Sequence, residues 1–235
     1  MKILSWNIWV DCHFEELKCF LSESNVDIIG LQEVKDDDPE RDVIGFLKKL
    51  GYEYVFAKTE QIWNGKVYRH GPAVFSKFPI VNSKTYLIDK EDERAFARAD
   101  VKVDDRILHI FSTHLIHTHQ KPSKQQEAQV NELIKQLPKD NVIMMGDFNA
   151  TPESEAIKKM REVLVDTGKD SDLTWSVYPE GCPACNPQSI DARLDYIFIS
   201  KDIKSKNFKV EESTASDHLP ISVEIDMQAF LLIKK

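Results

Sequence analysis

Residues 142–149 read VIMMGDFN, an apolar run that ends on an acid and, two residues later, on an amide. Four consecutive apolar residues, Val142 to Met145, are typical of a strand that is buried on both faces of a sheet. Asp147 and Asn149 therefore lie at the end of a buried strand, where an uncompensated charge is costly. This stretch predicts a layered α/β structure with polar chemistry at one end of its strands.

The order strand, helix, strand and acid occurs twice in the chain. Residues 2–33 follow it and end on Glu33, and residues 106–147 follow it and end on Asp147. Two similar layers packed face to face would bring both acids to one rim of the molecule. We therefore predict an α/β fold of four layers, a sandwich in which two packed mixed β-sheets are flanked by helices.

The spacing of apolar residues and the turn signals predict the other elements. Helices are expected over 14–21, 41–50, 123–137 and 153–161. Strands are expected over 2–8, 26–31, 52–58, 72–76, 80–88, 95–103, 106–113, 142–145, 194–199, 208–212 and 221–225. We expect loops over 63–70 and 166–192 on the substrate side, because loops commonly carry specificity.

The composition suits one domain. The chain has 235 residues, of which 42% are hydrophobic and 30% charged, and this is enough apolar material for one sizeable core. We expect a single domain over residues 1–235, with its core at about 1–226 and a short C-terminal tail. The net charge of −8 weighs against tight nonspecific binding of long nucleic acid, which rests on neutralisation of phosphates by basic residues.

Targeting signals are not evident in the sequence. The opening residues, MKILSWN, read as a strand rather than as a secretory leader. No apolar run approaches the roughly 18 residues of a membrane helix. We expect a cytoplasmic monomer without a membrane span.

The four cysteines are Cys12, Cys19, Cys182 and Cys185. Without an export signal they are most simply free thiols. The pair Cys182 and Cys185 in CPAC resembles half of a zinc site, which His117 and His119 could complete, but no second CxxC follows. We interpret the pair as a plain turn with two thiols, and we expect both histidines to face solvent on a loop.

A set of polar residues stands at the ends of apolar strands, and burying so many unpaired groups is costly unless a cation compensates them. The set comprises Asn7, Glu33, His114, Asp147, Asn149, Asp195, Asp217 and His218. Carboxylate and amide oxygens suit a hard cation such as Mg²⁺, with Mn²⁺ as a substitute. We predict that these strand ends converge at one rim around Mg²⁺.

Seven short motifs resemble the endonuclease/exonuclease/phosphatase superfamily, and they follow its order from the first strand to about residue 224. They are WNI (6–8), LQEV (31–34), GPAVFS (71–76), STHL (112–115), GDFN (146–149), RLDYI (193–197) and SDHLP (216–220). The resemblance, closest to the deoxyribonuclease-like branch, implies the same four-layer sandwich and a metal-dependent phosphohydrolase.

The resemblance also implies a role for each matched residue. The predicted metal ligands are Glu33, Asn7 and Asp217. The predicted catalytic residues are Asp147 and Asn149, which position water and phosphate, His218 with its partner Asp195, and His114 as a second histidine. For substrate binding, Arg94 matches an arginine of the family, and Tyr68 and His70 lie in the stretch where specificity is expected.

Each residue taken alone has a plainer interpretation. Asp147, Asn149 and Asp217 could cap turns after strands, and His114 could be a core histidine. We expect Trp6 and Trp9 to be packing residues and Phe148 to lie in the core. The ordered motifs favour the catalytic interpretation.

We therefore predict a Mg²⁺-dependent phosphoester hydrolase in which metal assists the attack of water. The favoured activity is a phosphodiesterase or nuclease on a nucleic-acid or nucleotide phosphodiester. The alternative is a phosphatase or a lipid phosphodiesterase of the sphingomyelin or inositol type. A non-catalytic binding module is disfavoured, because Glu33, Asp147 and His218 are all present. Both Asp147 and the His218–Asp195 pair stay candidates for the general base.

Overall fold

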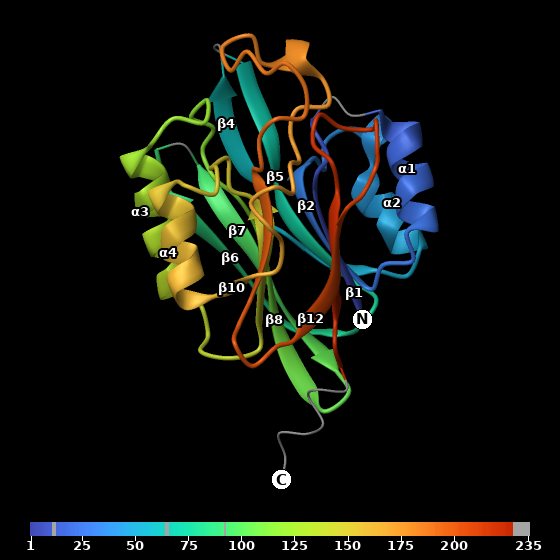
Figure 1. Ribbon diagram of the computed structural model, residues 1–235. Coiled ribbons are helices and arrows are strands. Elements are labelled where there is room, and N and C mark those ends of the chain that lie inside the picture. Colours follow the sequence, from blue (N-terminus) through green and yellow to red (C-terminus); the bar gives the residue numbers. More distant parts are fainter. Residues whose placement is uncertain (11–12, 64–65, 92, 228–235) are drawn as a thin grey trace.

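Two β-sheets lie face to face between two pairs of helices in the computed structural model (Figure 1). The structure describes residues 1–10, 13–63, 66–91 and 93–227. The first sheet has seven strands: β12 (Ser205–Val210), β13 (Ile221–Ile225), β1 (Lys2–Asn7), β2 (Ile28–Val34), β5 (Lys66–Ser76) and β3 (Glu53–Phe56) in that order, with β4 (Thr59–Trp63) paired to β5.

The second sheet has six strands. Their order is β10 (Val165–Asp166), β11 (Asp195–Ile199), β9 (Val142–Asp147), β8 (Arg106–His114), β7 (Arg94–Val103) and β6 (Ile80–Asp89). Each sheet contains a parallel pair, β1 with β2 and β8 with β9, among antiparallel neighbours. The sheets are therefore mixed, and the parallel pairs are the two halves that the repeated sequence order predicts.

The helices cover the outer faces of the sandwich. Figure 1 shows α1 (Phe14–Glu23) and α2 (Val43–Lys49) on the side of the first sheet, and α3 (Lys124–Lys135) and α4 (Glu155–Val163) on the other. Two short 3₁₀ turns, η1 (Pro39–Arg41) and η2 (Pro179–Gly181), lie in the connecting loops. The predicted four-layer α/β sandwich is confirmed.

Successive residues of the central strands pack into different cores. Ile3 packs between the two sheets, whereas Leu4 packs under the helices of the first sheet. In β9, Ile143 packs between the sheets and Met144 under α3 and α4. Side chains of a strand alternate between its two faces, so a strand that is covered on both faces needs the continuous apolar run that the sequence has.

The sheets approach each other closely near the middle of the sandwich. A Cβ atom added at Gly30 of β2 would lie 2.6 Å from the Sδ atom of Met145 on β9. Glycine therefore leaves room for a large side chain of the facing sheet. This contact lies close to the strand ends that carry Glu33 and Asp147.

One predicted loop is wrong. Residues 63–70 were expected to form a loop, but β4 ends at Trp63 and β5 begins at Lys66. Backbone pairing joins Thr59 to His70 and Glu60 to Arg69, and the latter two side chains form an ion pair of 2.7 Å. Polar residues dominate this hairpin, and the apolar pattern that identifies the other strands is therefore weak here.

The last strands differ from the predicted bounds in detail. β12 begins at Ser205 rather than near 208, because its pairing with β13 continues across a register shift between Lys206 and Lys209. None of the helices in the described part of the chain has the length and apolar composition needed to cross a bilayer.

Candidate active site

Strand register places three of the predicted site residues side by side. His114 at the end of β8 pairs with Asp147 at the end of β9, and Asp195 at the start of β11 pairs with the same Asp147. Neighbouring strands are about 4.8 Å apart. Asp147 therefore lies between a histidine and a second acid, and it is only 1% exposed.

The facing sheet contributes Asn7 and Glu33. The amide Nδ2 of Asn7 donates to Asp147 Oδ2 at 3.0 Å and to Glu33 Oε1 at 3.2 Å. The backbone N–H of Val10 donates to Glu33 Oε2 at 2.9 Å, and that of Trp9 to Asn7 Oδ1 at 3.0 Å. Residues from both sheets thus meet at one rim, as the strand ends predict.

Two site residues have left-handed backbone conformations. Glu33 has a φ of 62° and Asn149 a φ of 48°, a region that non-glycine residues adopt at a cost. The register of β2 against β5 shifts between Leu31 and Val34, next to Glu33. At Asn149, its own backbone N–H donates to Asp147 Oδ1 at 2.7 Å. A bulge can aim a side chain, and the irregularity in β2 directs Glu33 into the rim, whereas the backbone hydrogen bond to Asp147 holds the turn that carries Asn149.

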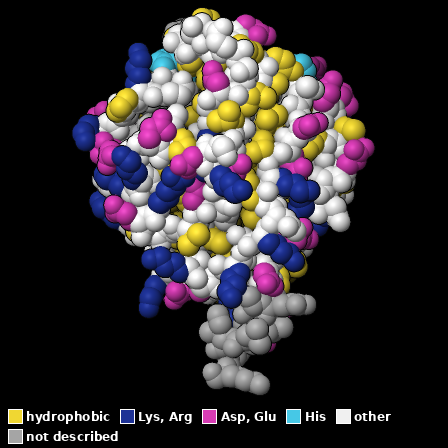
Figure 2. Space-filling model, viewed as in Figure 1, with side chains coloured by type: hydrophobic (Ala, Val, Ile, Leu, Met, Phe, Trp, Pro, Cys, Tyr) yellow, Lys and Arg dark blue, Asp and Glu magenta, His cyan; other side chains and the backbone are white. Residues whose placement is uncertain are grey.

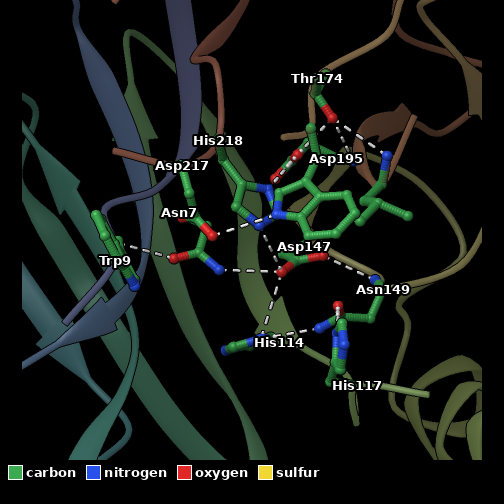
Figure 3. Close-up of polar contacts among 12 residues, drawn as sticks. Asn7, Trp9, His114, His117, Asp147, Asn149, Thr174, Asp195, Asp217 and His218 are labelled. Atoms are coloured by element: carbon green, nitrogen blue, oxygen red, sulfur yellow. Dashed lines mark hydrogen bonds and ion pairs between the residues drawn. The ribbon is translucent and has the colours of Figure 1, made fainter. Parts of the chain in front are cut away.

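His218 and Asp195 form a buried pair (Figure 3). His218 Nδ1 lies 2.8 Å from Asp195 Oδ2, and the two residues are 4% and 0% exposed. The hydroxyl of Thr174 donates to the same carboxylate oxygen at 2.6 Å. The imidazole is therefore held in one orientation, with its Nε2 atom directed toward Asp147 Oδ2 at 3.7 Å.

The loop that carries His218 is fixed through its backbone. Trp6 Nε1 donates to the His218 carbonyl at 2.8 Å, and the His218 N–H donates to Ser216 Oγ at 3.2 Å. Ser216 Oγ in turn donates to the carbonyl of Asn7 at 2.7 Å. The motif SDHLP is thus tied to the end of β1 at several points.

The two histidines of the site have opposite protonation tendencies. Burial acts to lower the pKa of His218, but the nearby carboxylates, with Asp195 foremost, outweigh it and raise the pKa well above its usual value. Burial lowers the pKa of His114 well below its usual value, and the charge of Arg94 adds to this effect. The surroundings therefore favour the cationic form of His218 and the neutral form of His114.

Asp147 lies between these histidines. Its Oδ2 atom is 3.4 Å from His114 Nε2 and 3.7 Å from His218 Nε2. Burial raises the pKa of Asp147 to about 7, with a further contribution from the charge of Asp195. A carboxyl with this pKa can accept or release a proton near neutral pH.

Asp217 directly precedes His218 in the motif SDHLP. Its carboxylate accepts hydrogen bonds from Trp175 Nε1 at 3.2 Å and from Ser216 Oγ at 3.3 Å. Burial raises its pKa, and the charge of Glu33 raises it further. Glu33 at the end of β2 and Asp217 in the loop before β13 are thus two acids that act on the same region.

The predicted substrate-binding residues border this rim. Burial lowers the pKa of His70, whose ring centroid is 6.3 Å from that of His114, and the charge of Arg94 contributes. His70 and Tyr68 also line a cavity of about 260 Å³ together with Lys35 and Arg69. The cavity opens beside the strand end that carries Glu33.

The chemistry of the rim fits a hard divalent cation. We call the eight predicted residues the central cluster: Asn7, Glu33, His114, Asp147, Asn149, Asp195, Asp217 and His218. Ligand atoms of Asp147, Asp195 and His218 lie within 4.8 Å of one another. The cluster contains four carboxylates, and its donors are mainly oxygen atoms, which suits Mg²⁺ or Mn²⁺.

Asn7 Nδ2 lies between Glu33 and Asp147, so ligation through Oδ1 would require the amide to turn.

The expectation for the cysteines and the loop histidines is wrong in part. Cys182 and Cys185 are joined by a disulfide rather than being free thiols, whereas Cys19 is a free, exposed thiol. Cys12 lies outside the described residues. His119 is exposed as expected, but His117 is half-buried, and its Nδ1 lies 2.8 Å from Asn149 Oδ1. Burial lowers the pKa of His117.

Sequence reasoning missed residues that support the site from the 166–192 stretch. Thr174 holds Asp195, and Trp175 holds Asp217. Neither belongs to a motif, and a threonine and a tryptophan in a polar loop carry no signal of their own. Their positions follow from backbone bridges of Trp175 to Ala192 and to His218.

The packing predictions near the site are confirmed. Trp6 and Phe148 are fully buried in the cores beneath the helices. Trp9 stacks on Tyr178 with ring centroids 5.6 Å apart. These rings support the loops around the rim.

The four-layer sandwich thus carries a largely buried cluster of four carboxylates and two histidines at one rim. The profile of the Endonuclease/Exonuclease/phosphatase family matches residues 4–218. The chain belongs to this family, whose members are phosphoester hydrolases, and it is an enzyme of that class.

Individual relatives agree with this assignment. Sphingomyelinase C of Bacillus cereus is 24% identical over 87% of this chain and 79% of its own length. An endonuclease/exonuclease/phosphatase family protein from Leptotrichia buccalis matches with a TM-score of 0.73 and 22% identity, over 97% of this chain and all (100%) of its own. The catalytic domain of human Nocturnin matches with a TM-score of 0.67 and 23% identity, over 96% and 94%. The two solved structures show the likeness of fold.

Proposed function

We propose that the chain is a Mg²⁺-dependent phosphodiesterase that acts on a nucleic-acid or nucleotide phosphodiester by attack of water. The observation that carries the proposal is the position of Asp147, with a cationic His218 on one side and a neutral His114 on the other. A donor, an acceptor and a proton-exchanging carboxyl in one buried rim are the parts that phosphoester hydrolysis needs.

The metal ligands in this proposal are Glu33 and Asp217, with Asn7 beside them. Glu33 lies at the end of β2 and Asp217 in the loop before β13, and the charge of Glu33 raises the pKa of Asp217, which indicates that both act on one region. A bound divalent cation would neutralise phosphoryl charge and make water more acidic. Mn²⁺ suits the same oxygen donors and should substitute.

His218 acts as the donor to the phosphoryl group. Its Nδ1–H is held by Asp195 at 2.8 Å, which leaves the protonated Nε2 free to donate toward the rim. A cationic donor stabilises the negative charge that develops on the phosphoryl oxygens. Because this group is already protonated at neutral pH, it suits the role of donor or acid rather than base.

Asp147 is the better candidate for the general base. Its pKa of about 7 in the metal-free protein lies near the operating pH, where proton transfer to a carboxylate is most effective. Asn149 is held against it by the backbone hydrogen bond of 2.7 Å. Asp147 would take the proton of the attacking water, while Asn149 would position the phosphate.

His114 acts as a second polar contact to the phosphoryl group. Asn149 Nδ2 donates to His114 Nε2 at 3.0 Å, so the proton of the neutral imidazole is placed on Nδ1. His70 and Arg94 lie near it, as the effect of both on the pKa of His114 indicates. Arg94 would supply a fixed positive charge for the substrate phosphate.

The cavity beside Glu33 supports a small substrate unit. Its lining includes the aromatic ring of Tyr68, the cations Lys35 and Arg69, and the acids Asp37 and Asp38, in a volume of about 260 Å³. Lys35 forms an ion pair with Asp38 at 3.3 Å. A base can stack on a ring such as that of Tyr68. On the face in Figure 2, lysine and arginine side chains are interspersed with aspartate and glutamate side chains rather than gathered in one basic patch. This favours recognition of one nucleotide unit or a chain end over a long track on nucleic acid.

A lipid phosphodiester is the second candidate substrate. The observation that favours it is the 24% identity with sphingomyelinase C of Bacillus cereus over 87% of this chain. The net charge of −8 also suits a small headgroup better than a polyanion. Both candidates share the phosphodiester chemistry and differ in the group that fills the cavity.

A panel of labelled substrates separates the candidates. We would measure turnover of abasic duplex DNA, single-stranded DNA, RNA, tyrosyl-DNA, sphingomyelin and inositol phosphates with Mg²⁺, and with EDTA as the control. We expect the highest kcat/KM on a nucleotide phosphodiester. Turnover of sphingomyelin alone would select the second candidate, and exclusive cleavage of phosphomonoesters would contradict a phosphodiesterase.

A further inference from the structure

Two loops bring four ligating side chains together outside the central cluster. His117 and His119 lie in the loop after β8, and Cys182 and Cys185 lie in the 166–192 stretch, more than 60 residues away. One ligand atom from each of the four lies within 4.8 Å of all the others. We call these four residues the Cys/His cluster.

Five of the six separations between these atoms resemble the edges of a tetrahedron. His117 Nε2 lies 3.4 Å from Cys185 Sγ and 3.8 Å from Cys182 Sγ. His119 Nδ1 lies 3.3 Å and 3.6 Å from the same two sulfurs, and 3.1 Å from His117 Nε2.

Zinc geometry predicts similar values. Zinc bonds of about 2.3 Å to sulfur and about 2.0–2.1 Å to nitrogen place the S–N edges of a tetrahedron near 3.5 Å and the N–N edge near 3.3 Å. Four S–N edges and the N–N edge of the Cys/His cluster lie close to these values. The sixth edge joins the two sulfurs, which form a disulfide in this structure.

The hydrogen bond of His117 fixes the tautomer that a metal ligand needs. Its Nδ1 lies 2.8 Å from the carbonyl oxygen Oδ1 of Asn149, and an amide oxygen can only accept. The proton is therefore on Nδ1, and the lone pair on Nε2 faces the two cysteines and His119. Histidines that bind zinc commonly donate their other N–H to such an oxygen. Figure 3 shows His117 beside Asn149.

We propose that the Cys/His cluster, with its cysteines reduced, binds one Zn²⁺ through two thiolates and two imidazoles. Reduction of the disulfide by an external dithiol transfers two electrons and two protons to the cysteines, while the dithiol becomes a disulfide. Binding of Zn²⁺ then displaces the two thiol protons to solvent. Sulfur and nitrogen donors select zinc here, whereas the oxygen donors of the central cluster select Mg²⁺.

The proposed zinc site is structural. Four protein ligands complete a tetrahedral shell and leave no position for water or substrate. The ion would join the loop after β8 to the 166–192 stretch, which also carries Thr174 and Trp175. Through His117 it would also fix Asn149, an amide of the central cluster.

Metal content is the direct test. The full-length protein is expressed with added zinc, purified with a non-thiol reductant and no chelator, and desalted, and its zinc is measured by mass spectrometry. We expect about one Zn²⁺ per chain in the wild type and in Cys19→Ser, whose exposed thiol lies outside the cluster. The double variant Cys182→Ser/Cys185→Ser should retain less than about a tenth of that amount, because it lacks both thiolates.

A milder variant guards against misfolding of the double variant. His119→Gln removes one exposed ligand, and we expect at least about a tenfold loss of zinc affinity in competition with a chromophoric chelator. Co²⁺ bound to the reduced wild type should show thiolate charge-transfer and tetrahedral d–d absorption, which His119→Gln weakens. Absence of stoichiometric zinc in the reduced wild type, or retention of zinc without both cysteines, would overturn the proposal.

Discussion

The central cluster and the Cys/His cluster are neighbours, but the chain builds them in different ways. The first stands on strand ends, so that register alone brings His114 and Asp195 beside Asp147. The second stands on two loops, and backbone pairing does not fix its geometry in advance. Paired strands of a sheet hold carboxylates close together despite their mutual repulsion. Two loops without such pairing need a covalent or metal link to stay together.

The two clusters also differ in donor chemistry and burial. Asp147 and Asp195 are 1% and 0% exposed, and the central cluster is rich in oxygen. The Cys/His cluster is half-buried or exposed, and its donors are sulfur and nitrogen. One hydrogen bond, from His117 to Asn149, connects them.

The largest expected effect is that of metal removal. EDTA should reduce phosphodiesterase activity to background, because the carboxylates of the central cluster cannot replace the positive charge of the cation. Mg²⁺ or Mn²⁺ should restore activity, and Zn²⁺ should not. Initial rates before and after chelation, with zinc content measured in parallel, test this expectation. Full activity in EDTA would remove the metal from the mechanism.

The second effect concerns the pair of His218 and Asp195. His218→Ala should lower kcat by about 10²–10⁴, the range for positioned acid–base groups. Asp195→Asn should also lower kcat, and the double variant should be scarcely worse than His218→Ala, because residues that act as a unit are not additive. A double-mutant cycle in kcat gives the coupling. Multiplicative losses would show that the two side chains act independently.

The third effect separates metal binding from chemistry. Glu33→Gln should raise the Mg²⁺ concentration for half-maximal activity by about 10–100-fold, because a neutral amide compensates the cation poorly. Glu132→Gln on the exposed face of α3 is the matched control, and it should titrate like the wild type. An unchanged Mg²⁺ titration in Glu33→Gln would place Glu33 away from the metal.

The smallest effect on kcat should come from removal of the hydrogen bond between His117 and Asn149, which connects the clusters. His117→Ala removes the hydrogen bond to Asn149 Oδ1 and should lower kcat by up to about tenfold, roughly 1.4 kcal/mol, with little change in KM. His119→Ala is the control, because His119 contacts the other members of the Cys/His cluster but has no hydrogen bond to Asn149 among the described contacts. Equal losses in both variants would show that Asn149 is not held through His117.

The thermal stability of the protein as a function of pH tests the effect of burial on Asp147. In the metal-free protein the pKa of Asp147 is raised to about 7, above the value of about 3.9 in an unfolded chain. The folded state therefore binds the proton more tightly, and stability falls as pH rises from about 4 to 7. Asp147→Asn should remove this loss, so its Tm should exceed that of wild type by a few degrees at pH 8, given about 2–4 °C per kcal/mol. A lower Tm at pH 8 would contradict the argument.

The sequence predicts the layers and the central cluster for a physical reason. Runs such as Val142–Met145 are apolar because both faces of the strand are covered, and an acid that follows such a run is conspicuous. Asp147, Glu33 and His218 can therefore be recognised as candidate site residues from the sequence alone. Their convergence follows from two parallel strand pairs packed face to face.

The sequence does not predict what the loops bring together. Thr174 reaches Asp195 across 21 positions, and His117 reaches Cys185 across 68, and no periodicity encodes such contacts. The β4–β5 hairpin was missed because its polar strands lack the apolar alternation on which strand prediction depends. The left-handed backbone at Glu33 and Asn149 is likewise invisible, since neither residue is glycine.

In the mechanism that we propose, phosphodiester hydrolysis depends on Asp147 at the rim, and a comparison of kcat between two variants measures this dependence. Asp147→Asn is compared with Asp100→Asn, a buried acid of the same sheet that is bound to Arg98 and His109. The substrate is bis(p-nitrophenyl) phosphate with saturating Mg²⁺, and circular dichroism verifies the fold of both variants. We expect a loss of about 10²–10⁴ in kcat for Asp147→Asn and near wild-type turnover for Asp100→Asn. A folded Asp147→Asn protein with wild-type kcat would contradict this mechanism.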